Sequence, residues 1–338
     1  MEPHPTDFAR ALSTYLSLYL PGQRNVSPNT IQSYRDTFKL LLTYCQGVRH
    51  LAIERLTLGD LDDQLVIGFL TWLEEERHNT KSTRNQRLAC LHAFYRYLQV
   101  EDPMGLLGYQ KILAIPMKKT PQPFVHHLSA DALGLILAQP DRRTRQGRRD
   151  ATLLAVLYDS GARVQELVDL RVRDVRLDPP PVLSLTGKGR KTRQVPLMSP
   201  TAALLRQYLD ECQLGPNGTQ DDPLFVNRQR HKLTSKGVAY ILSKYATCAR
   251  AVSPIVPENI TPHVFRHTKA MHLLQAGVNL IYIRDLLGHV DIATTEIYAR
   301  ADTELKRHAL EKVYPNLISP DLPAWTEDAD LLTWLTRL

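Results

Sequence analysis

Apolar side chains recur at three- and four-residue steps in several stretches of the first hundred or so residues. This spacing places them on one face of a helix. It predicts four amphipathic helices, over residues 7–20, from Pro28 onward, over 60–78 and over 82–98. Pro21-Gly22 ends the first helix, and Ser27 before Pro28 is a typical N-cap followed by proline at the first helical position. The N-terminal part of the chain is therefore predicted to be a helical bundle.

The periodicity weakens between residues 101 and 129, where prolines prevent a continuous helix. A chain of 338 residues is also too long for one ordinary core. We therefore predict a helical domain over 1–105, a linker over 106–127, a second domain over 128–319 and a C-terminal tail over 320–338. Lys118 and Lys119 lie in the linker, where a phosphate can reach them.

A strand pattern interrupts the helical patterns of the second domain at Val182–Leu197. Apolar residues alternate there on both sides of a Gly-Lys-Gly turn, which is typical of a β-hairpin. The fold is accordingly predicted to be mainly α with a small β-hairpin or sheet, an α+β arrangement. Cationic side chains crowd the tip of the hairpin, namely Lys188, Arg190, Lys191 and Arg193. A basic hairpin of this kind is expected to touch DNA nonspecifically.

The formal net charge is +7, which favours a polyanionic partner such as nucleic acid. Cations occupy the start of the fourth predicted helix, where the helix dipole disfavours them, so an external phosphate is one explanation and a solvated polar end is another. These cations are Lys81, Arg84 and Arg87. A second basic group precedes the second domain's first long helix and suits either DNA-backbone contact or a solvated surface. It contains Arg142, Arg143, Arg145, Arg148 and Arg149.

The four cysteines form no C-x-x-C pair and have no zinc-ligand spacing with histidine, so they are interpreted as thiols in a reducing compartment. No apolar run is long enough to span a membrane, and the N-terminus has no signal-peptide pattern. A cytoplasmic protein without a metal or other cofactor is expected.

The densest set of reactive side chains lies between Thr261 and Arg300. Thr261-Pro262 begins a helix on which His263 and Arg266 share a face. Gly288 ends the next helix and His289 follows it directly, while Tyr298 lies on the last predicted helix.

Two further candidates lie upstream of this stretch. Arg163 begins a helix after Ser160-Gly161, and Glu166, one turn later, can orient it. Arginines suit the nonbridging oxygens of a phosphodiester. A tyrosine can attack the phosphorus if a histidine accepts its proton.

The ordered series resembles the catalytic half of the tyrosine recombinases, the phage-integrase-like and Xer-like enzymes, over residues 128–313. The matching residues are Arg163, Lys188, His263, Arg266, His289 and Tyr298. The helical N-terminal part is compatible with the core-binding domain of the same family. Arg300 departs from the pattern, since Xer-like enzymes have histidine there, and Lys269 adds a cation to the helix of His263.

The resemblance implies a site-specific DNA recombinase that cleaves and rejoins strands without metal or ATP. Tyr298 would form a 3′-phosphotyrosyl linkage, with His263 as base and His289 donating a hydrogen bond to the phosphate. Lys188 would protonate the leaving 5′ oxygen, with Lys191 as the fallback. His267 and His272 are interpreted as structural. Transposition, phage integration or excision, and Xer-like resolution all fit.

The end of the tail is apolar and is predicted to form a short helix with Leu331, Leu332, Trp334, Leu335 and Leu338. The family implies docking in trans, which would link four protomers on two double-stranded DNA sites, whereas docking on its own domain is the alternative. Two rival functions remain open on sequence alone. They are a type IB topoisomerase-like relaxing enzyme and a noncatalytic DNA-binding protein of the same fold.

Overall fold

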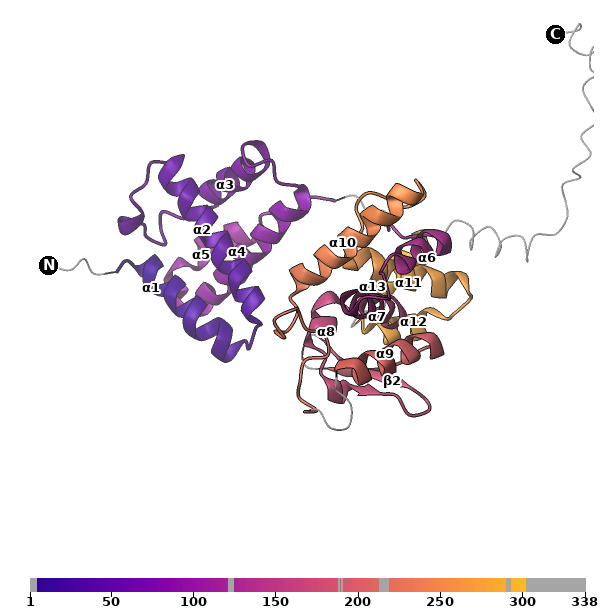
Figure 1. Ribbon diagram of the computed structural model, residues 1–338. Helices are drawn as coiled ribbons and strands as arrows, with labels where there is room; N and C mark the ends of the chain where they lie inside the picture. The colour runs from indigo at the N-terminus through magenta and orange to yellow at the C-terminus, as the bar shows by residue number, and fades with distance from the viewer. Residues whose placement is uncertain are drawn as a thin grey trace, which may run out of the picture. The chain divides into compact units, whose positions relative to one another are not determined.

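The computed structural model describes residues 5–120, 125–187, 189, 191–212, 219–289 and 293–301. The chain divides into two compact units, Met1–Pro123 and Phe124–Leu338 (Figure 1). Among the described residues, no helix combines the length and apolar character needed to cross a membrane.

The N-terminal unit is helical throughout, as its periodicity predicts. Its helices are α1 (Asp7–Thr14), which continues into a π-helical segment (Tyr15–Gln23), α2 (Pro28–Gly47), α3 (Asp63–Glu75), α4 (Lys81–Glu101) and α5 (Leu106–Leu113), with 3-10 turns at Ile53–Arg55 and Pro103–Gly105. Side chains of Ser27, Asp62 and Thr80 cap α2, α3 and α4 by accepting a backbone N–H of the first turn. The core contains an aromatic cluster in which Tyr15 and Phe38 meet Phe94 edge-on.

The helix α5 lies in the stretch predicted to be a linker. It packs against α3 and α4, and its Tyr109 and Ile112 are buried in the core of the N-terminal unit. Residues 106–113 are therefore helical and belong to the N-terminal unit. The sequence signal was weak because eight residues span barely two helical turns, too few for a clear periodicity.

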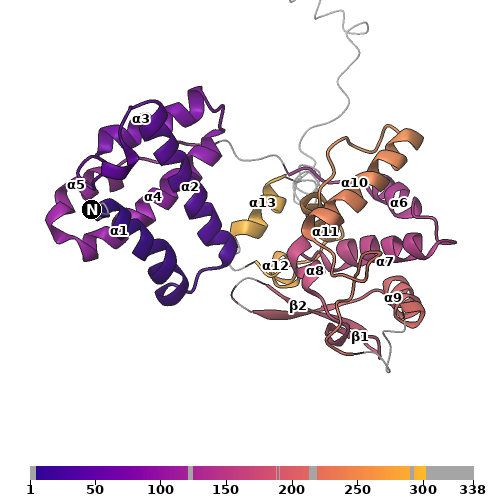
Figure 2. The same ribbon diagram turned by 60° about the vertical axis from the view of Figure 1, so that its left-hand side comes forward.

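The C-terminal unit combines helices with one small sheet, which confirms the predicted mainly α, α+β fold. Its elements are α6 (Ala130–Ala138), α7 (Arg145–Ser160), α8 (Val164–Asp169), a 3-10 turn (Val172–Asp174), β1 (Val175–Arg176), β2 (Val182–Thr186), β3 (Thr192–Pro196), α9 (Ser199–Cys212), α10 (Ser235–Val252), α11 (Pro262–Gln275), α12 (Leu280–Leu287) and α13 (Ala293–Ala301). The buried helix α7 packs against α6, α9 and α11 (Figure 2).

The hairpin of β2 and β3 is antiparallel, and β1 adds a third strand on the far side of β2. Leu183 pairs with Val195, and Leu185 pairs with Arg193. Since side chains alternate along a strand, Arg193 lies on the same face of β3 as the buried Val195. The strand therefore directs this arginine towards the interior of the unit.

Two glycines in the left-handed region end the helices that lead into the candidate site. Gly161 follows α7 with φ +57°, and Gly288 follows α12 with φ +65°. This conformation is open to glycine at little cost and closes a helix C-terminus. Each glycine turns the chain so that Arg163 or His289 follows almost at once.

Candidate active site

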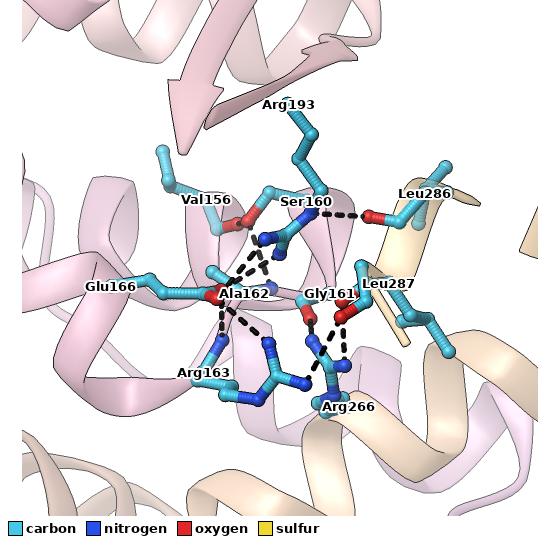
Figure 3. A network of polar contacts seen from close by, with 11 residues as sticks. Val156, Ser160, Gly161, Ala162, Arg163, Glu166, Arg193, Arg266, Leu286 and Leu287 are labelled. Atoms are coloured by element: carbon cyan, nitrogen blue, oxygen red, sulfur yellow. Dashed lines mark hydrogen bonds and ion pairs between the residues drawn. The ribbon is translucent and has the colours of Figure 1, made fainter. Parts of the chain in front are cut away.

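Three arginine side chains converge where α8, β3 and α11 meet, and two of them bind one buried carboxylate (Figure 3). Glu166, whose side chain is 4% exposed, accepts hydrogen bonds from Arg163 Nη1 at 2.9 Å and from the Arg163 backbone N–H at 2.9 Å. Arg193 donates to both oxygens of the same carboxylate, at 3.0 and 2.7 Å. Burial raises the pKa of Glu166, but these hydrogen bonds outweigh it and lower that pKa overall. Glu166 is therefore ionised at neutral pH.

The third arginine, Arg266, binds the carbonyl ends of two helices. It is 4% exposed, and its Nη1 and Nη2 donate to the carbonyls of Gly161 and Leu287 at 2.6 and 2.7 Å (Figure 3). Helix C-termini carry unsatisfied carbonyls and partial negative charge, so a buried guanidinium is stable there. Burial and the charge of Arg163 lower the pKa of Arg266 to about 10, which leaves it protonated at neutral pH.

The phenol of Tyr298 is enclosed between two imidazoles. Tyr298 is 1% exposed, and its hydroxyl hydrogen-bonds to Nδ1 of His267 at 2.9 Å. The His289 ring stacks on it at a centroid distance of 6.3 Å and an interplanar angle of 15°. Burial raises the pKa of Tyr298, although the charges of Arg266 and Arg163 act in the opposite direction. The phenol is thus protonated at neutral pH and suits attack only if its proton is accepted.

His289 is neutral in this setting. Burial, followed by the charges of Arg266 and Arg163, lowers its pKa to about 4. Its Nδ1 lies 2.8 Å from Oγ1 of Thr295, a contact that orients the ring. A neutral imidazole can donate one hydrogen bond to a phosphate oxygen without adding a charge.

The structure brings four of the six predicted catalytic side chains into one neighbourhood, those of Arg163, Arg266, His289 and Tyr298. His263 lies on the first turn of α11 and is exposed, one turn before His267. Lys188 lies outside the described residues, as do Arg190 and the predicted tail over 320–338.

Sequence reasoning missed two residues of this site. The sequence indicates a structural role for His267, yet it is the histidine whose ring nitrogen meets the Tyr298 hydroxyl. Its position four residues after His263, on the same helical face, was the available signal. Arg193 was predicted to contact DNA, and the alternation along β3 could have placed it inward with Val195.

The predicted DNA contacts also divide by burial. Several are exposed in the structure, namely Lys81, Lys118, Lys119, Arg142, Arg143, Arg145 and Lys191. Three of these also approach a carboxylate: Lys118 approaches Glu74 at 2.5 Å, Arg143 approaches Asp141 at 2.9 Å, and Arg145 lies 3.9 Å from Glu211. An exposed ion pair of this kind is weak, so it leaves the cation open to exchange with a phosphate.

Arg84 and Arg87, by contrast, point into the N-terminal unit. Arg84 is 6% exposed, and its Nη1 donates to the carbonyl of Pro116 at 3.1 Å. Arg87 donates to the Ser33 carbonyl at 3.2 Å and to Thr37 Oγ1 at 3.1 Å. In the structure these two cations tie α4 to neighbouring segments, instead of pointing outward to DNA as predicted.

Over the described part of the chain, no group of His, Cys, Asp and Glu side chains is arranged to hold a metal ion. The described polar groups of the site are guanidinium, imidazole and phenol groups, together with the carboxylate of Glu166. These groups suit the binding of a phosphodiester and attack on it.

Comparison with known proteins gives consistent matches over both units. Residues 126–304 match the model of the phage integrase family, and residues 13–102 match that of the phage integrase N-terminal SAM-like domain. The chain is 37% identical to the putative integrase/recombinase y4rC of Sinorhizobium fredii, over 98% of each chain. It is 31% identical to the tyrosine recombinase XerC of Pelobacter propionicus, over 90% of this chain and 95% of that one.

Solved structures match the fold. A XerH site-specific recombinase bound to its difH substrate in a pre-cleavage complex covers 86% of this chain, and the match covers 81% of that one, with 22% identity and a TM-score of 0.65. The Tn1549 transposon integrase in complex with transposon right-end DNA gives a TM-score of 0.67 at 16% identity, over 88% of this chain and 98% of that one.

Proposed function

Since this chain belongs to the phage integrase family of tyrosine recombinases, and is thus a site-specific DNA strand transferase, we propose that Tyr298 is its nucleophile. The observation that carries this assignment is the position of the phenol among Arg163, Arg266 and His289, the groups that a phosphodiester needs. The relatives that match most of the chain's length are named recombinases, so a relaxing enzyme or a noncatalytic DNA-binding protein is not favoured.

In the proposed reaction, Arg163 and Arg266 neutralise the nonbridging oxygens of the scissile phosphate. The phenolic oxygen of Tyr298 forms a bond to phosphorus, and the bond from phosphorus to the 5′ oxygen breaks. A histidine accepts the phenolic proton, and Lys188 of the hairpin supplies a proton to the departing 5′ oxygen. A 5′-hydroxyl from a partner strand then reverses these steps, so ligation consumes no ATP.

The site is closed in the structure. Tyr298 is 1% exposed and Arg266 is 4% exposed, so a phosphodiester cannot touch both until the site opens. In this form the phenol is bound to His267. We assign His267 the task of holding Tyr298 inside before DNA binds, and we retain the exposed His263 as the base that acts on the opened site.

A suicide substrate that traps the covalent adduct tests these assignments. Tyr298→Phe should form no adduct, because the attacking oxygen is gone. His263→Phe should slow adduct formation by ~10²–10⁴-fold, the usual contribution of general base catalysis. His267→Phe should cleave at least as fast as the parent. The opposite pattern for the two histidines would move the base role to His267, and an adduct in Tyr298→Phe would refute the proposed nucleophile.

DNA binding by both units follows from the proposed function. The exposed cations Lys81, Lys119, Arg142 and Lys191 are suited to the phosphate backbone. The solved structures of similar fold include recombinases and integrases in complex with DNA, which supports this proposal.

We further propose that four protomers act on two DNA sites and that residues 320–338 dock in trans on a neighbouring protomer. Deletion of this segment should reduce cooperative binding and recombination more than the affinity of one protomer for a half-site. Gel-shift titrations on half-sites and full sites measure both quantities. Unchanged cooperativity would refute docking in trans.

A further inference from the structure

We propose that Arg193 is a positioning residue for strand cleavage, which cancels the charge of Glu166 so that Arg163 and Arg266 present theirs to the phosphate. This inference rests on the proposed function of the same site. It differs from the expectation of the sequence, in which Arg193 belonged to a DNA-contacting hairpin.

The contacts of Arg193 leave it little access to DNA. Its side chain is 13% exposed and forms a two-point ion pair with Glu166, with Nη1 to Oε1 at 3.0 Å and Nη2 to Oε2 at 2.7 Å. Its Nε donates to the carbonyl of Leu286 at 2.7 Å (Figure 3). The fork geometry of guanidinium matches a carboxylate in a way that an ammonium group cannot reproduce.

The ion pair of Arg193 and Glu166 balances the charge of the buried carboxylate beside Arg163. Among the described contacts of the three guanidinium groups, Glu166 supplies the only carboxylate. If Arg193 is removed, the remaining ionic partner of Glu166 at the site is Arg163, at 2.9 Å. A buried carboxylate would then compete with the phosphate for Arg163 and oppose the negative charge that the phosphate brings. With Arg193 present, Glu166 orients Arg163 while its charge is balanced.

The hydrogen bond from Arg193 Nε to the Leu286 carbonyl also helps to position His289. Leu286 lies in the last turn of α12, and the chain reaches His289 through Gly288. Arg193 and Gly288 are so close that a Cβ added at Gly288 would lie 2.9 Å from Arg193 Nη1. Arg193 therefore joins strand β3 to the start of α8 and the end of α12, the segments that carry Arg163 and His289.

Full-length variants separate positioning from folding and from DNA affinity. The set comprises Arg193→Met, Arg193→Lys, Glu166→Gln and the double variant Glu166→Gln/Arg193→Met. The control is Arg173→Gln, which removes an exposed ion pair with Asp221 in the same unit. Each variant is measured for adduct formation at saturating suicide substrate, for half-site affinity and for thermal unfolding.

Arg193→Met should form the adduct about 100-fold more slowly, which is the loss typical of a misplaced catalytic group. Its affinity for a half-site should stay within about twofold of the parent's, because the affected side chains are largely buried. The double variant should cleave about tenfold faster than Arg193→Met, since it removes the uncompensated charge as well. Arg193→Lys keeps the charge without the fork and should lie between the parent and Arg193→Met, which provides a test even if the methionine variant fails to fold.

Two results would overturn the inference. One is adduct formation by Arg193→Met or Arg193→Lys at the rate of the Arg173→Gln control. The other is a folded double variant no faster than Arg193→Met, which would mean that Arg193 acts through packing alone. Both leave the Tyr298-dependent adduct of the parent intact, whereas failure of the proposed function removes that adduct.

Discussion

The hydrogen bond between Tyr298 and His267 should be measurable as a coupling energy in the DNA-free protein. The perturbations are Tyr298→Phe, His267→Phe and the double variant. Each single change removes one partner of the 2.9 Å contact and nearly preserves the size of the side chain. The two residues should therefore show a non-additive effect on the free energy of unfolding.

The magnitude follows from the burial of the pair. Tyr298 is 1% exposed, so its hydroxyl has no ready access to bulk water when its partner is lost. A hydrogen bond between uncharged groups contributes about 1 kcal/mol net. Each single variant should lose about that much, and the double variant should lose no more than about the same amount, since the second change finds no bond left to break. Such a coupling energy corresponds to about a fivefold change in the ratio of closed to open forms.

Urea unfolding of the four proteins, at a pH above the pKa of His267, provides the assay. Two transitions are expected if the two units unfold separately, and the coupling should appear only in the transition of the C-terminal unit. Adduct formation at limiting DNA should rise up to about fivefold in His267→Phe, by the same shift of the equilibrium. Strictly additive losses would show that the bond does not form in solution and would refute the closed arrangement.

Three further predictions concern other parts of the structure. The pKa of His289 is about 4 in the folded protein, against an ordinary value of 6.5. The unfolded chain therefore binds more protons between these two values, and the free energy of unfolding should fall as pH drops from 6.5 towards 4. His289→Asn should flatten this pH dependence in unfolding curves, and an unchanged dependence would contradict the prediction. Gly288→Ala should cost about 1–2 kcal/mol of stability because of the left-handed φ at this position. It should also slow adduct formation, because the new Cβ displaces Arg193. A variant that is fully active and equally stable would be inconsistent with the described turn. Arg84→Met should destabilise the N-terminal unit without changing the salt dependence of DNA binding. Lys81→Ala, by contrast, should reduce the steepness of the plot of log binding constant against log salt concentration by about 1. The reverse result would identify Arg84 as a phosphate contact.

Much of this fold was predictable because local signals agreed with the packing. The caps at Ser27 and Thr261 begin helices where the sequence predicts them, and Gly288 ends one where it predicts an end. The alternation around Gly187 and Gly189 likewise predicted the hairpin. In each case the signal depends on a few neighbouring residues, so it is present in the sequence before the chain folds.

Long cationic side chains were harder to place. A cation at a helix start indicates an anion nearby, but at Arg84 the partner is a backbone carbonyl of the same unit, 32 residues away in sequence. Arg193 similarly finds Glu166 and the end of α12, both distant in sequence. Which of His263 and His267 contacts the Tyr298 hydroxyl depends on where α13 packs, and no local sequence pattern determines that packing. Such contacts are tertiary, so the residue type alone could not predict them.

The two carbonyls that bind Arg266 also bear on how this site can diverge over time. The carbonyl of Gly161 and the carbonyl next to Gly288 both contact one guanidinium, and both glycines have positive φ. A side chain at either position would strain the turn and displace a carbonyl from Arg266. Active relatives should therefore keep both glycines together with the arginine, whichever DNA sequence they recognise. An alignment restricted to active family members would reveal this as joint retention of three positions, only one of which bears a side chain that a phosphate can touch.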